Sequence, residues 1–131
     1  MRRRLIALLA CLVVTLPPAA AAAGALPAQS SSAAGVTVKA TPRALSGPVW
    51  EFEVVFDTHS KDLNDDPAKS ASLHAAGTIA APVAWQGDPP GGHHRKGVLR
   101  FKAIAPAPAA LELRLQRAGE PSPRVFRWNL K

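Results

Sequence analysis

The sequence predicts an all-β protein, and more narrowly an antiparallel β-sandwich of about seven strands. Three observations lead to this prediction. Apolar and polar residues alternate with a period of two in several short runs, as in strands with one buried face. Segments rich in Pro, Gly or Asp separate these runs. The chain has 131 residues with 13 Pro, 9 Gly and few aromatic residues, which disfavours a helical bundle and limits it to one domain.

The clearest strand is predicted at 50–56, where large apolar residues alternate with Glu51 and Glu53. Further strands with the same period are predicted at 36–40, 99–103, 111–115 and 126–130. Weaker strands are expected at 71–75 and 78–85. Immunoglobulin-like, fibronectin-III-like and cupredoxin-like topologies all agree with this pattern.

Residues 1–23 are expected to form a cleaved signal peptide. Residues 2–4 are arginines, an apolar run of 12 residues follows at 5–16, and the small residues after it suit cleavage behind Ala23. A membrane-spanning helix needs about 20 apolar residues, so this run is too short to be one. The protein is therefore expected to be exported to the periplasm or the cell exterior, with no membrane span in the mature chain.

A lipoprotein is the alternative, because the residues up to Cys11 read Leu-Leu-Ala-Cys, as in a lipobox. Against it, an apolar run follows Cys11 where a polar tether is normally found. Cleavage behind Ala23 leaves a mature chain without cysteine, which excludes an intrachain disulfide and suits an oxidising compartment.

The mature chain is expected to consist of a flexible leader, 24–35, and a β-sandwich domain, 36–131. The leader is small and polar, with little to bury. The arginines at 2–4 supply three of the seven net positive charges, so the mature chain keeps a net charge of +4. This modest excess, without a dense stripe of Lys and Arg, disfavours nucleic acid as a partner.

Two loops carry most of the candidate chemistry. One, 57–66, follows the clearest strand, and the other, 85–97, precedes the strand at 99–103. Together they hold three of the four histidines and five of the nine acidic residues. The fourth histidine, His74, lies in or beside a weak strand, and the pattern leaves open whether it joins the others.

Imidazole and carboxylate groups together suit Cu(II), Zn(II) or Ni(II), so we predict a metal site of His59, His93 and His94 with Asp57 assisting. In extended chain Asp57 and His59 point to one face, with Cα atoms about 7 Å apart. Without Cys or Met in the mature chain, a blue-copper site or a soft Cu(I) site is excluded. The simpler alternative is that these histidines are structural or solvated.

The acidic stretch admits a calcium interpretation, since Asp62, Asn64 and Asp66 alternate as in a calcium-binding loop. However, no glycine or closing Glu follows, and Pro67 interrupts the stretch. A helix N-cap or an Asx-turn is therefore favoured for these residues.

The protein is expected not to be an enzyme, because it lacks nucleophile-elbow, phosphate-loop and zinc-protease motifs. The alternatives to metal binding are a structural accessory with no metal and a module that meets another envelope protein. That module would use the same loops, with Trp85, Arg95 and Lys96 at the contact.

The two loops also carry a resemblance. The pattern D-T-H-S-x-D-L at 57–63, followed by W-x-G-D-P-P-G-G-H-H-R-x-G-x-L-x-F at 85–101, resembles a group of small exported bacterial proteins. The resemblance covers most of 48–102 and the end at 124–130. It implies an exported domain with these loops as its distinctive part, and implies no activity. The D-x-H triplet is similar to copper-binding periplasmic proteins of the copper-resistance type, which also use an N-terminal His that this chain lacks.

Overall fold

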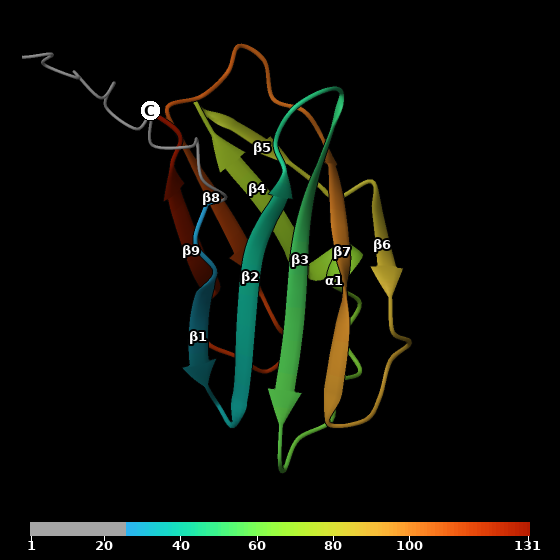
Figure 1. The fold of residues 1–131 in the computed structure, drawn as a ribbon. Helices are drawn as coiled ribbons and strands as arrows, with labels where there is room; N and C mark the ends of the chain where they lie inside the picture. Colours follow the sequence, from blue (N-terminus) through green and yellow to red (C-terminus); the bar gives the residue numbers. More distant parts are fainter. Residues whose placement is uncertain (1–25) are drawn as a thin grey trace, which may run out of the picture.

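Two antiparallel sheets make up the fold (Figure 1). The computed structural model describes residues 26–131, so the predicted signal peptide and Cys11 lie outside the described residues. The first sheet has the strand order β1 (Gln29–Ala33), β2 (Val36–Ala44), β3 (Val49–Thr58), β7 (His94–Lys102), β6 (Ala84–Gly87). The second has the order β5 (Thr78–Ala80), β4 (Ala71–Ala75), β8 (Ala110–Leu115), β9 (Arg124–Asn129). A short helix, α1 (Pro67–Ser70), lies between β3 and β4 in the chain.

The two sheets share one apolar core. The ring centroids of Phe52 in β3 and Trp128 in β9 lie 5.7 Å apart, so side chains of the two sheets meet. Phe101 of β7 packs edge-to-face on Phe52. The largest fully buried side chains are Phe52, Phe56, Phe101, Phe126, Leu63, Leu73, Leu99, Leu111, Leu113, Leu115, Val38 and Val54. Except for Leu63, which lies in the loop after β3, they occupy the apolar positions of the period-two runs, and the all-β prediction is confirmed.

Every predicted run contains a strand, but the run at 78–85 forms two strands instead of one. β5 pairs with β4 in the second sheet, whereas β6 pairs with β7 in the first. Pro82 lies between them, and a proline cannot donate to a strand ladder because it has no backbone N–H. The chain therefore crosses from one sheet to the other at this point.

The expectation of a flexible leader at 24–35 is wrong for Gln29–Ala33, which form strand β1. This strand pairs along its length with β2. Its polar side chains add no buried apolar surface, but Arg124 of β9 donates to the carbonyl oxygens of Ser31 and Ala33 at 2.7 and 2.8 Å. The amide of Gln29 bonds the backbone N–H and C=O of Arg127. Hydrogen bonds, not apolar burial, hold this segment.

Four connections meet at one end of the molecule, called here the loop end: the β1–β2 turn at 34–35 and the loops at 59–66, 88–93 and 116–123 (Figure 1). The first sheet brings three of them together, because β2, β3 and β7 are neighbours. The fourth is joined to them by contacts between Arg117 and Asp65. Both loops that the sequence singled out therefore lie at the same end.

A buried group of charges, called here the arginine cluster, ties this end together: Asp65, Arg117, Glu120 and Arg124. Arg117 donates to both carboxylate oxygens of Asp65, at 2.9 and 3.2 Å. Arg124 donates twice to Glu120, each time at 2.8 Å. None of the four side chains is more than 10% exposed.

The contacts within the arginine cluster shift two pKa values. The hydrogen bond from Arg124 is the largest influence on Glu120 and holds the pKa of that carboxyl below its ordinary value, although burial acts in the opposite direction. Burial alone lowers the pKa of Arg117, but the hydrogen bond and charge of Asp65, together with Glu120, bring it above its ordinary value. Both shifts favour the charged forms of Glu120 and Arg117.

Candidate functional site

Asp57 and His94 form a hydrogen-bonded pair across two strands. The β3–β7 register places them directly opposite each other, and the alternation of the strands turns both side chains away from the core. Nδ1 of His94 lies 2.5 Å from Oδ1 of Asp57. The two side chains are 61% and 56% exposed, so this pair faces solvent.

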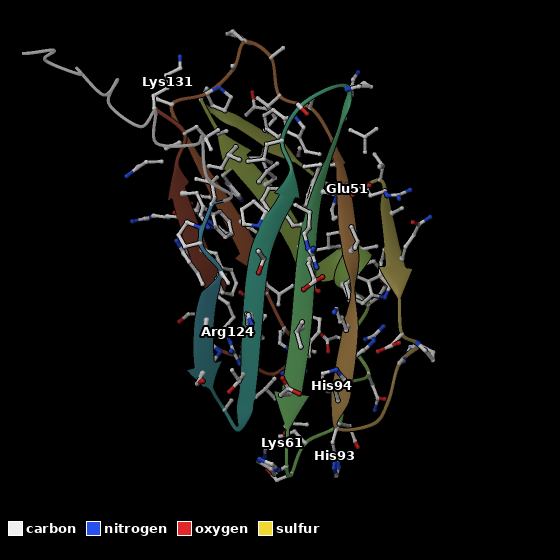
Figure 2. All side chains as sticks on the ribbon, viewed as in Figure 1. Glu51, Lys61, His93, His94, Arg124 and Lys131 are labelled. Carbon is white, nitrogen blue, oxygen red and sulfur yellow. The ribbon has the colours of Figure 1, made fainter. Side chains whose placement is uncertain are left out.

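All four residues predicted to bind a metal border one cavity at the loop end. The cavity has a volume of about 430 Å³ and is lined by Gly35, Thr37, Asp57, Thr58, His59, His93 and His94. His94 is the first residue of β7, and His93 directly precedes it (Figure 2). His59 directly follows β3. We call Asp57, His59, His93 and His94 the histidine cluster. The strand pairing brings these residues together from two separate parts of the sequence.

The histidine cluster is open in this structure. Within residues 26–131, no three His, Cys, Asp or Glu side chains converge on a point that could hold a metal ion. His59 and His93 are both exposed, so their rings are not held by packing. The metal site therefore stays a prediction, with one hydrogen-bonded pair already formed.

Comparisons of the chain with protein-family models, with curated proteins and with solved structures found no match. In the part of the chain that the structure describes, no helix has the length and apolar character needed to cross a membrane.

His74 lies apart from the histidine cluster. It belongs to β4 in the second sheet, and its Nε2 lies 2.8 Å from Oγ of Ser72. It borders a different cavity, of about 350 Å³, with Glu112 and Arg127 among its lining residues. The structure thus places three of the four histidines together and leaves His74 on another sheet.

The acidic loop has structural roles at two of its positions. Asp66 is the N-cap of α1, where its Oδ1 accepts a hydrogen bond from the backbone N–H of Ala68 at 3.0 Å. Both carboxylate oxygens of Asp65 accept from Arg117. The predicted N-cap role is confirmed for Asp66, whereas Asp65 was not one of the three residues of the calcium pattern.

The surface suggested for an envelope partner does not include Arg95. This residue is 2% exposed, and its guanidinium donates to the backbone carbonyls of Leu63, Asp65 and Asp88. It also lies 5.5 Å from the ring centroid of Trp85, which is half-buried. Arg95 therefore links the two loops through the hydrogen bonds of its buried side chain. Of the three proposed contact residues, only Lys96 is exposed.

Thr58 was not among the site residues predicted from the sequence. This residue lies between Asp57 and His59 in the chain and lines the same cavity. Its side chain is inward-facing and 6% exposed. The alternation along β3 could have identified this residue. After Phe52, Val54 and Phe56, the next position that faces the core is 58.

Proposed function

We propose that this protein is an exported, non-enzymatic all-β protein that binds a divalent transition metal, Cu(II), Zn(II) or Ni(II), at the histidine cluster. The observation that carries the proposal is the Asp57–His94 pair in a cavity lined by the other two histidines. Nitrogen and oxygen groups are the ligands that these three ions accept in proteins.

The Asp57–His94 pair supports metal binding because of the tautomer it selects. A carboxylate oxygen accepts hydrogen bonds, so Nδ1 of His94 carries the proton and donates it to Asp57. In the neutral imidazole Nε2 then keeps its lone pair, which is what a metal ion requires. Metal-bound histidines commonly donate their other ring N–H to a carboxylate in this way. Asp57 therefore orients His94 and is not itself a direct ligand in the proposed site.

His93 and His59 supply the remaining protein ligands. Both side chains are exposed, and exposed side chains change rotamer within picoseconds to nanoseconds. Turning toward Nε2 of His94 gives two or three imidazole nitrogens, and water completes the coordination. The site is therefore assembled as the metal binds.

Isothermal calorimetry with Cu(II), Zn(II) and Ni(II) tests the proposal. We expect the wild type to bind at least one of these ions, and His94→Ala to cause the largest loss of affinity. Asp57→Asn should weaken binding about 10-fold, as expected for a residue that orients a ligand. The matched control is His74→Ala, which removes a histidine from the other sheet and should leave the affinity unchanged. Equal binding by His93→Ala, His94→Ala and the wild type would falsify the metal assignment.

Export is tested separately on the protein recovered from its host. Cleavage behind Ala23 makes Gly24 the first residue of the mature chain, and mass spectrometry of the N-terminal peptide measures this directly. A cytoplasmic protein that still begins at residue 1 would contradict the expected export.

A further inference from the structure

We propose that Thr58 is the positioning residue of the histidine cluster, holding His59 and His93 beside the Asp57–His94 pair. The consequence for metal affinity rests on the proposed function, whereas the positioning itself rests on hydrogen bonds alone. Thr58 is the last residue of β3, and its neighbours in the chain are Asp57 and His59.

The hydroxyl of Thr58 joins two segments that line the cavity. It donates to the carbonyl oxygen of Gly35 in the β1–β2 turn at 2.7 Å. It accepts from the backbone N–H of Lys61 at 3.1 Å and of Ser60 at 3.3 Å. One donor and two lone pairs are all that a hydroxyl offers, so its hydrogen-bonding capacity is fully used. The chain on the C-terminal side of His59 is thereby fixed against the turn.

The backbone of Thr58 holds the third segment. Its N–H donates to the carbonyl oxygen of His93 at 2.9 Å, just before β7 begins at His94. His94 is itself set opposite Asp57 by the strand register. Two members of the histidine cluster are thus placed by strand pairing, and the other two lie in segments bonded to Thr58.

The position of Gly35 also shows how close the turn lies to the loop that follows His59. The φ of Gly35 is +76°, which favours glycine, and a Cβ at this position would lie 3.4 Å from side-chain atoms of Ser60 and Lys61. The loop that follows His59 therefore lies directly over the turn that accepts the Thr58 hydrogen bond. Lys61, His93 and His94 are accordingly found at the same end of the molecule (Figure 2).

Two substitutions distinguish the effect of the Thr58 hydroxyl from that of the rest of the side chain. Thr58→Val keeps the shape and removes all three side-chain hydrogen bonds, whereas Thr58→Ser keeps the hydroxyl and removes a methyl group. The matched control is Thr41→Val, which makes the same chemical change on β2 outside the cavity.

Amide hydrogen exchange, followed by NMR in the absence of metal, measures the positioning. In Thr58→Val the amides of Ser60 and Lys61 should exchange about 10-fold faster or more, because their acceptor is gone. Thr58→Ser and Thr41→Val should exchange as the wild type does. Central amides of β3 and β7 report global stability, so acceleration confined to 59–61 marks a local effect. Unchanged exchange at Ser60 and Lys61 in Thr58→Val would overturn the inference.

Calorimetric Cu(II) affinity measures the consequence for the site. We expect a loss of about 10-fold in Thr58→Val and near-complete retention in Thr58→Ser. If the wild type binds no metal, the proposed function fails, and the exchange rates alone decide the positioning. If the wild type binds and Thr58→Val binds equally well, the metal assignment stands and the role of Thr58 in it is refuted.

Discussion

The arginine cluster and the histidine cluster lie at the same end of the molecule, but they differ in how much of their bonding capacity is used. In the arginine cluster, both oxygens of Asp65 and both oxygens of Glu120 accept from arginines, and the side chains are no more than 10% exposed. In the histidine cluster, Asp57 and His94 are more than half exposed and share one hydrogen bond.

The difference follows from the cost of burying charge. An unpaired buried charge costs several kcal/mol, so a buried group has to be satisfied by its own members. An exposed group is satisfied by water and can exchange that water for a ligand. We infer that the arginine cluster is part of the scaffold, and that the histidine cluster is the part of this end available for binding.

The largest expected effect comes from breaking the arginine cluster. Arg124→Ala leaves Glu120 buried without its main partner and removes the donor to Ser31 and Ala33. We expect the free energy of unfolding to fall by about 3–5 kcal/mol, measured by urea denaturation. The control is Arg127→Ala, whose side chain is 77% exposed and which should cost less than about 1 kcal/mol. Similar losses in both variants would contradict the structural role of the arginine cluster.

A smaller effect is expected from acid. The pKa of Glu120 is lowered in the folded protein, so its carboxylate stabilises the fold above its unfolded-state pKa. That contribution is lost as the pH falls from about 4.3 through the lower folded value. We expect the urea midpoint of the wild type to decrease over this range. Glu120→Gln should have a lower urea midpoint than the wild type at neutral pH, but its midpoint should decrease less on acidification.

Glu112→Gln is the matched control for the acid experiment. The pKa of Glu112 is also lowered, first by the hydrogen bond from Arg127 and then by that from Arg114. Glu112 lies on the outer face of β8 with its side chain 13% exposed, however, and its partners Arg114 and Arg127 are 42% and 77% exposed, so water screens these charges more than those of the arginine cluster. The acid-induced decrease should therefore remain close to that of the wild type. If the urea midpoint depended less on pH in Glu112→Gln than in Glu120→Gln, the arginine cluster would not be the main acid-sensitive element.

The smallest effect on stability is expected in the histidine cluster. Asp57→Asn weakens an exposed hydrogen bond and should change the free energy of unfolding by no more than about 0.5 kcal/mol. The same variant is expected to weaken metal binding about 10-fold, so stability and affinity should separate. A loss of stability comparable to that of Arg124→Ala would show that this pair, too, belongs to the scaffold.

The strands were predictable wherever burial repeats with a period of two. β3 is an example, since buried residues such as Phe52, Val54 and Phe56 alternate with more exposed ones over the whole strand. β1 was not predictable in this way, because its polar sequence has no apolar face. Its place depends on Arg124, more than 90 residues away in the chain, and on the outer edge of β2.

The candidate site was predictable in its residues but not in its arrangement. The pairing of Asp57 with His94 depends on β3 and β7 being neighbours, and these strands are not consecutive in the chain. The buried arginines did have a pattern that could have identified them. Arg124 continues the inward series of Phe126 and Trp128, but a charged residue at such a position is normally assigned to the surface.

The bond between Ser31 and Arg124 has a consequence for the order of folding. It joins β1 to β9 across 93 positions, so β1 can pair with its neighbour β2 early but gains the contacts of Arg124 only when almost the whole chain is present. Contacts between such distant segments form slowly, because the intervening chain must first be brought to order. In a chain exported as proposed, the domain would stay incomplete while its C-terminal strand was still being translocated. β9 would then supply Arg124, which donates hydrogen bonds to β1.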